Sequence, residues 1–185
     1  MSELSRRLVH ASGALVPGAF LASVVGWPVV QAVFVVGAGV AVVLEALRLS
    51  GRVSWWIYDA LTREYEQDNP AGYALYMLAA AATVLVFAPP IAVPALLMLS
   101  LGDPVSGLLS SGGTGLKAGW VLLATFGVCL AIASLLAVPL PAAVAGALAA
   151  TLADGTTPVV RGYVLDDNAT IPLGSAAAMW LVLAV

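Results

Sequence analysis

Acidic and basic side chains that interrupt apolar segments are the features of this sequence best suited to chemistry. Asp103 lies within an otherwise apolar run, residues 91–109, where Gly107 allows close approach of a neighbouring group. A charge inside a membrane segment costs about 2.5–3.5 kcal/mol on insertion scales. Such a residue is therefore usually paired with another polar group or has a function. The small, polar stretch after this run ends at Lys117 and could offer backbone N–H groups and an ammonium to a phosphate. A glycine-rich turn with a boundary aspartate is the alternative interpretation.

A second acidic group stands near the end of the chain. Asp166, Asp167 and Asn168 lie together just before the apolar segment 171–185, and Asp154 precedes them. Mg²⁺ prefers oxygen ligands and is often held by one or two carboxylates plus substrate phosphates. The two neighbouring aspartates would point in different directions, so we expect one of them to take part in the site. Capping of the following helix is the alternative, and the two roles are compatible.

His10 and Glu45 are two further ionisable residues within apolar segments. His10 is the only histidine, and a lone histidine on a helix is more often a packing residue than a catalyst. Glu45 has Arg48 three residues later, on the same helical face. If Glu45 is buried in the bundle, it needs a partner such as Arg48, Arg7 or His10.

The composition requires a bilayer as the solvent for most of the chain. Of 185 residues, 62% are hydrophobic and only 9% are charged, and the mean hydropathy is +1.03. A soluble domain carries about 25% charged residues. Continuous apolar runs such as 29–44 indicate helices, because barrel strands alternate apolar and polar residues. We therefore expect an all-α fold, a polytopic transmembrane helix bundle in which residues 1–185 form one integral membrane domain.

About seven spans are expected, since each membrane helix needs about 20 apolar residues. Prolines mark three tight turns at one end, and every Lys and Arg then falls at the other end, as is typical of the cytoplasmic side. So few basic residues exclude a strongly basic nucleic-acid face. The expected spans are 8–26, 28–49, 71–88, 91–110, 118–138, 140–153 and 171–185. The basic residues are Arg6, Arg7, Arg48, Arg52, Arg63, Lys117 and Arg161.

Three stretches occur in an order that resembles the dolichol kinase and phytol kinase family, which is similar to the membrane CTP-dependent phosphatidate cytidylyltransferases. They are Arg6-Arg7-Leu8-Val9-His10-Ala11-Ser12-Gly13, Gly102-Asp103-Pro104 with the lysine that follows, and Asp166-Asp167-Asn168 to Pro172. The resemblance implies a membrane enzyme that uses CTP and a divalent metal to phosphorylate a long isoprenoid alcohol. The family's Lys-Thr-x-Glu-Gly stretch is reduced here to Lys117-Ala118-Gly119. The matching positions are His10, Glu45, Asp103, Lys117, Asp167 and Asn168.

The expected function is therefore CTP-dependent phosphorylation of a dolichol or polyprenol at the cytoplasmic face. Asp103 and Asp167 are expected to lie close enough to share Mg²⁺, and Lys117 to stabilise charge during phosphoryl transfer. The expected substrate-binding residues are His10, Glu45, Gly107, Asn168 and Arg161. The first alternative is a cytidylyltransferase that acts on a lipid phosphate. A transporter ranks lower, because its ionisable residues would be expected near the bilayer midplane.

Overall fold

The protein is almost entirely helical in the computed structural model, which confirms the all-α class. The exception among the described residues is a short antiparallel hairpin, β1 (Val159–Val160) and β2 (Tyr163–Val164), in which Val159 pairs with Val164. The structure describes residues 3–51, 55, 58, 62, 69–110, 116–156, 159–160 and 163–185. The helices are α1 (Glu3–Ser12), α2 (Leu15–Leu21), α3 (Trp27–Leu49), α5 (Gly72–Val86), α6 (Pro89–Leu97), the π-helix η2 (Met98–Gly102), α7 (Asp103–Leu109), α8 (Gly119–Leu135), α9 (Leu140–Gly155) and α10 (Asp167–Ala184).

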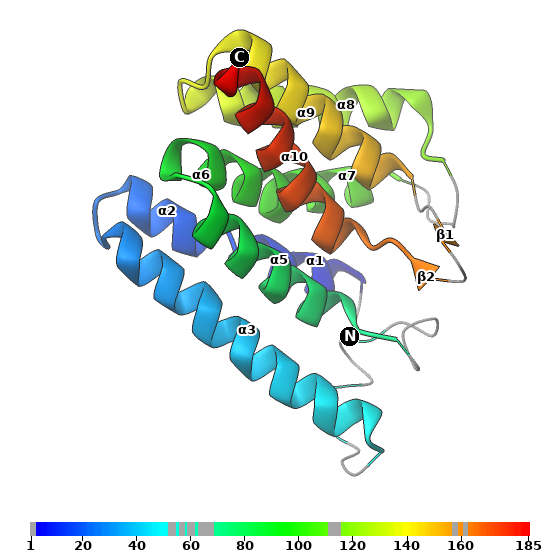
Figure 1. Cartoon of the computed structure of the whole chain (residues 1–185). Coiled ribbons are helices and arrows are strands. Elements are labelled where there is room, and N and C mark those ends of the chain that lie inside the picture. The colour runs from blue at the N-terminus through cyan, green and yellow to red at the C-terminus, as the bar shows by residue number, and fades with distance from the viewer. Residues whose placement is uncertain are drawn as a thin grey trace.

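Prolines begin several of these helices, as the sequence predicts. Pro28, Pro90 and Pro141 each lie in the first turn of a helix, where a missing N–H costs nothing and the fixed φ suits the helix. The turns that precede α3, α6 and α9 lie at one end of the molecule (Figure 1). The hairpin and the first residues of α10 lie at the other end.

Three expected segments differ in detail from the observed helices. The segment 8–26 contains two helices, α1 and α2, with a break at Gly13 where the Tyr76 hydroxyl approaches the backbone. The segment 91–110 is built from α6, η2 and α7 in succession, so a π-helical turn lies directly before Asp103. The last helix begins at Asp167 rather than at residue 171, because Asp166 caps its first turn.

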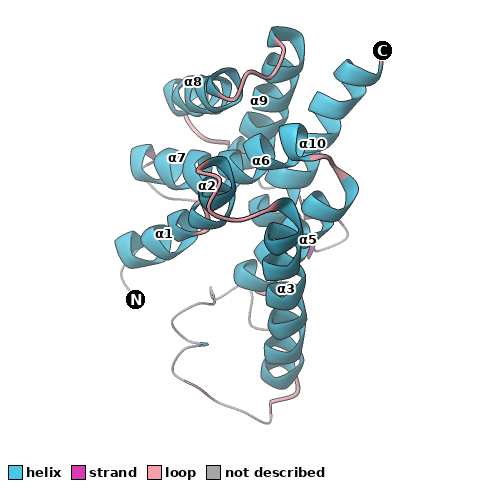
Figure 2. Ribbon diagram, turned by 90° about the vertical axis from the view of Figure 1, so that its left-hand side faces the viewer, coloured by secondary structure: helices cyan, strands magenta, loops and turns pink. Residues whose placement is uncertain are grey.

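The helices form a layered bundle with α3 at its edge (Figure 2). Helix α3 packs against α5 and α2, whereas α9 packs between α8 and α10. Helix α1 lies against α7 and η2, which brings the start of the chain next to its middle. The buried core includes Phe34, Leu96, Leu99 and Met179, which are fully or almost fully enclosed. The helices run between the end with the turns before α3, α6 and α9 and the end with the β1–β2 hairpin.

Two of the described helical stretches are long and apolar enough to cross a membrane. They are Trp27–Leu49, with a mean hydropathy of 2.2, and Pro89–Leu109, with 1.6. Three shorter apolar helices, α5, α8 and α9, accompany them. The first stretch is only 28% buried, so most of its apolar surface faces outward. The expected seven spans thus reduce to two segments that meet the length criterion.

Candidate functional site

Three aspartates from three different helices meet at one end of the bundle. Oxygen atoms of Asp103, Asp154 and Asp167 all lie within 4.8 Å of one another. Asp154 is almost fully buried, and the other two are partly buried. The structure thus brings Asp103 and Asp167 together, as the sequence predicts, and adds Asp154. Hard carboxylate oxygens at this spacing fit a divalent cation such as Mg²⁺.

Helix ends position two of these aspartates. Asp167 is the first residue of α10, where the positive end of the helix dipole favours a carboxylate, whereas Asp103 lies within the continuous helical stretch Pro89–Leu109. Asp154 instead lies in the last turn of α9, where the dipole disfavours negative charge. Asp154 therefore needs a compensating partner.

Lys117 supplies that partner. Its ammonium donates to Asp154 Oδ1 at 2.7 Å and to Ser106 Oγ at 2.9 Å, and Ser106 donates to Asp154 Oδ2 at 2.6 Å. The backbone N–H of Lys117 also donates to the carbonyl of Gly155 at 3.2 Å. The lysine that precedes α8 is thus tied at two points to the end of α9, and both Asp154 oxygens are engaged.

Asp166 and Asp167 divide the two roles expected of this acidic stretch. Asp166 caps α10 and accepts from the backbone N–H of Asn168 at 2.9 Å and from its side-chain amide at 2.7 Å. Asp167, the next residue, faces the other aspartates. Asn168 is buried, and its side-chain amide donates to Asp166 and, at 3.5 Å, to Asp167.

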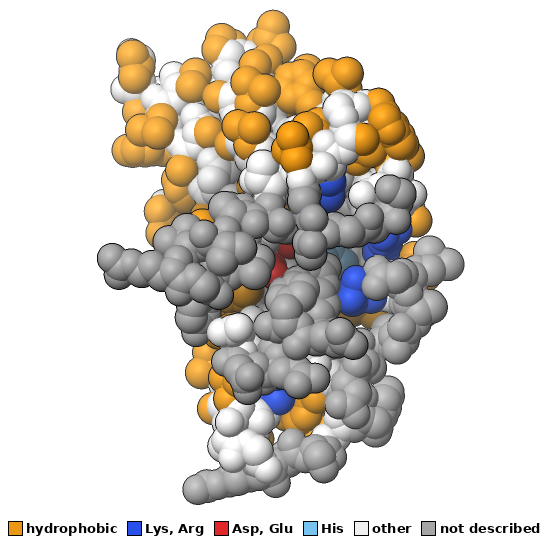
Figure 3. All heavy atoms as spheres, turned by 90° about the vertical axis from the view of Figure 1, so that its right-hand side faces the viewer, with side chains coloured by type: hydrophobic (Ala, Val, Ile, Leu, Met, Phe, Trp, Pro, Cys, Tyr) orange, Lys and Arg blue, Asp and Glu red, His pale blue; other side chains and the backbone are white. Residues whose placement is uncertain are grey.

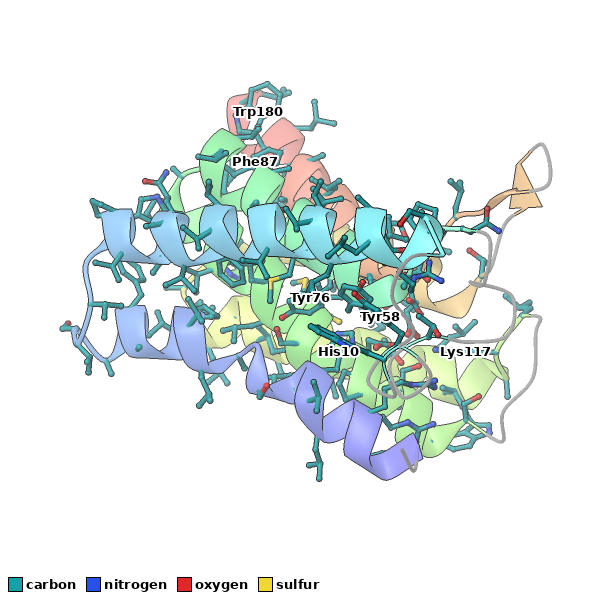
Figure 4. The ribbon with its side chains drawn as sticks, turned by 90° about the horizontal axis from the view of Figure 1, so that it is seen from below. His10, Tyr58, Tyr76, Phe87, Lys117 and Trp180 are labelled. Atoms are coloured by element: carbon teal, nitrogen blue, oxygen red, sulfur yellow. The ribbon has the colours of Figure 1, made fainter. Side chains whose placement is uncertain are left out.

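His10 lies beside Asp103, where α1 meets α7. Its Nδ1 is 3.4 Å from Asp103 Oδ2, and its ring packs edge-on against Tyr76 with centroids 5.0 Å apart. The Tyr76 hydroxyl hydrogen-bonds Ser100 Oγ at 2.8 Å. Figure 4 shows His10 and Tyr76 beside each other between α1 and α3, with Lys117 farther toward the loop end. His10 therefore belongs to the site by geometry.

Glu45 takes part in a separate polar cluster at the junction of α3 and α5. Its carboxylate pairs with Arg48 and accepts hydrogen bonds from the Tyr73 hydroxyl and from the backbone N–H of Ala71. Arg48 also donates to the carbonyl of Asn69 at 2.6 Å. The partner expected for Glu45 is thus Arg48. The described contacts of Glu45 join two helices, and substrate binding by this residue stays a prediction.

The remaining predicted residues lie as follows. Gly107 faces the Arg7 guanidinium so closely that a Cβ there would lie 3.1 Å from Arg7 Nε. The absence of a side chain at this position therefore lets α1 and α7 approach. Arg161 lies outside the described residues.

Ser106 and Asp154 are the site residues to which the sequence interpretation assigned no role. A serine four residues from the end of an apolar segment carries no signal of its own. Asp154 did carry a signal, because it directly follows an apolar segment, much as Asp103 interrupts an apolar segment. Figure 3 shows acidic (red) and basic (blue) side chains near the middle of one face, and apolar side chains (orange) over its upper part. No protein-family model, curated protein or solved structure matches the chain.

Proposed function

We propose that this protein is a membrane-embedded, CTP-dependent kinase that phosphorylates a long-chain isoprenoid alcohol such as dolichol or another polyprenol. The observation that carries the proposal is the meeting of Asp103, Asp154 and Asp167 within 4.8 Å, at the polar end of an apolar helix bundle. The resemblance of the sequence stretches around His10, Asp103 and Asp167 to dolichol and phytol kinases supplies the substrate class.

A membrane location is supported by the outward-facing apolar side chains. Leu135, Val24 and Leu123 are 86%, 74% and 73% exposed, which is far more apolar exposure than a water-facing surface tolerates. We propose seven crossings: α1 with α2, α3, α5, α6 to α7, α8, α9 and α10. The site would then face the cytoplasm, because the described basic residues Arg6, Arg7, Arg48 and Lys117 share its end of the bundle. Water-soluble CTP and the hydroxyl of a membrane lipid can meet only at such a boundary.

The charges of the site suit one divalent ion. Three carboxylates and the Lys117 ammonium leave two negative charges, which one Mg²⁺ held by Asp103 and Asp167 would balance. Such an ion neutralises phosphate charge when bound. Asp154 already has both oxygens engaged, so its part is to fix the Lys117 ammonium beside the phosphate-binding region.

The proposed reaction needs little covalent chemistry from the protein. The alcohol oxygen bonds to the γ-phosphorus while the bond from that phosphorus to the β–γ bridging oxygen breaks, and CDP leaves. A carboxylate of the site accepts the alcohol proton. The apolar helices would hold the lipid tail, and the hydroxyl would reach the carboxylates from the bilayer side.

The experiment follows the label of radioactive CTP into lipid. Purified protein in detergent is given γ-labelled CTP, Mg²⁺ and a polyprenol, and lipid-bound label is measured. The wild type should label the lipid. Asp103→Asn keeps the shape but removes a charge, and it should lower the rate by about 100-fold or more while the protein stays folded by size-exclusion chromatography.

The position of the label separates the two enzyme classes. Lipid labelled from α-labelled CTP would indicate the cytidylyltransferase that the sequence leaves as an alternative. If folded protein transfers label from neither position to any of several polyprenols and lipid phosphates, both assignments are wrong.

A further inference from the structure

Thr125, in the middle of α8, carries a buried hydroxyl that the bundle itself does not use. The residue is 1% exposed, and its Oγ1 has no hydrogen-bond partner among the described residues. Buried polar groups in native proteins are nearly always paired, so an unpaired one points to a water, an ion or a functional role. The cost of leaving it unpaired is highest in an apolar interior.

Four other buried hydroxyls in the same bundle are paired within their own helices. Each donates to the carbonyl oxygen four residues earlier, at 2.6–2.8 Å, which is the usual way for a membrane helix to satisfy a hydroxyl. Thr125 does not make the corresponding bond to Val121. Thr125 thus differs from these residues, because no described residue pairs with its hydroxyl. The four paired residues are Thr83, Ser100, Thr151 and Ser175.

The register of α8 places Thr125 beside the acidic site. Residues three and four apart share a helix face, so Thr125 lies between Leu122 and Cys129 on one face. A Cβ on Gly155 would meet Leu122 Cδ2 at 2.3 Å, and a Cβ on Gly102 would meet Cys129 Sγ at 3.0 Å. Each of these glycines is the chain neighbour of one site aspartate. The helix face that carries Thr125 therefore packs against the glycines that adjoin Asp103 and Asp154.

We propose that Thr125 is a positioning residue of the site, whose hydroxyl holds a water molecule of the divalent ion bound at Asp103 and Asp167. This inference rests on the ion site of the proposed function. Mg²⁺ gives up its waters reluctantly and usually keeps several of them when bound to carboxylates. Those waters need partners, and outer groups of this kind orient the ion and tune its affinity. A buried hydroxyl on the wall of the site meets that need.

The test is binding of Mn²⁺, in place of Mg²⁺, to the purified full chain in detergent without nucleotide. Thr125→Val keeps the shape and removes the hydroxyl, and it should weaken Mn²⁺ binding about tenfold. Thr125→Ser keeps the hydroxyl and should bind nearly as the wild type does. Thr83→Val is the matched control, because it removes a buried hydroxyl that bonds only within its own helix, so its Mn²⁺ affinity should equal that of the wild type.

A second measurement separates positioning from folding. Without metal, Thr125→Val should unfold at the same temperature as the wild type or higher, because it removes an unpaired buried group. Equal Mn²⁺ affinity of Thr125→Val and the wild type, with binding abolished in Asp103→Asn, would overturn the role of Thr125 and leave the ion site standing. A wild-type protein that binds no Mn²⁺ would overturn both.

Discussion

At the scale of single residues, the Lys117–Asp154 pair decides the charge of the site. Asp154 is 1% exposed at its side chain and lies at the unfavourable end of a helix dipole, whereas Lys117 is 19% exposed. A buried ion pair is costly to break from one side, because the remaining charge is left in a medium that solvates it poorly. Lys117 therefore stabilises the fold, in addition to its proposed contact with phosphate.

Lys117→Met should lower the free energy of unfolding by about 3 kcal/mol, since it leaves Asp154 buried and uncompensated. The double variant Lys117→Met/Asp154→Asn should recover much of that loss, because Ser106 can still donate to the amide oxygen. Unfolding in detergent, followed by circular dichroism, measures both. Additive losses in the double variant would show that the two side chains do not stabilise each other.

At the scale of elements, Glu45 joins the end of α3 to the start of α5. It accepts the backbone N–H of Ala71, directly before α5, and the hydroxyl of Tyr73 within it. Arg48 completes the cluster from α3 itself. A carboxylate in this position caps one helix and anchors another, so it holds the edge helix α3 against the bundle.

Glu45→Ala should therefore lower the free energy of unfolding by about 3 kcal/mol. It removes the acceptor of the Arg48 guanidinium, the Ala71 N–H and the Tyr73 hydroxyl. Tyr73→Phe removes one donor from the same carboxylate and should cost only about 1 kcal/mol. The comparison uses the free energy of unfolding of each variant. A loss for Glu45→Ala no greater than that for Tyr73→Phe would mean that the junction is held elsewhere.

The break between α1 and α2 sets the position of His10 relative to the site. A Cβ on Gly13 would lie 1.8 Å from the Tyr76 hydroxyl, which packs next to His10 and bonds Ser100. A side chain at this position must displace Tyr76 or push α1 away from the bundle. The close approach at Gly13 is thus what allows the start of the chain to reach Asp103.

Gly13→Ala should lower both the unfolding temperature and the activity, because both depend on the packing of α1 against α7 and η2. Gly18→Ala is the matched control, since nothing lies within 4 Å of a Cβ there and alanine favours a helix by about 1 kcal/mol over glycine. Thermal unfolding of the two variants tests this directly. If the two alanine variants unfold alike, Gly13 is not a point of close approach.

At the scale of the whole molecule, the two ends of the bundle differ in chemistry. The turns before α3, α6 and α9 lie at one end, and the end of α9 and the start of α10, which carry Asp154 and Asp167, lie at the other (Figure 1). In a membrane protein this division implies that the two ends face opposite sides of the bilayer.

Cysteine labelling tests that topology. With the buried Cys129 replaced by alanine, Trp27→Cys, Pro89→Cys and Pro139→Cys should react with an impermeant reagent from outside the cell. Leu116→Cys, which replaces a 75% exposed residue at the opposite end, should react only after the membrane is opened. Reaction of all four positions from one side would contradict the seven crossings and the cytoplasmic site.

Local features of the sequence predicted the helices and part of the site. Continuous apolar runs and prolines act within one segment, so the all-α class and the proline-marked turns followed from them. A charge inside an apolar run is also a local signal, and it identified Asp103. The π-helical turn before Asp103 and the break at Gly13 were not predicted, because each depends on what packs against the segment.

The sequence by itself determined an apolar helical chain with its acidic residues at segment ends, because burial and helix formation depend on nearest neighbours along the chain. Only the tertiary structure decided which ends meet. It brought Asp154 to Asp103 and Asp167, gave Lys117 its partner in α9, and separated Glu45 into a junction of its own. It also gave the Thr125 hydroxyl no hydrogen-bond partner among the residues that the structure describes. These contacts join residues tens of positions apart, and helix packing rather than local pattern selects them.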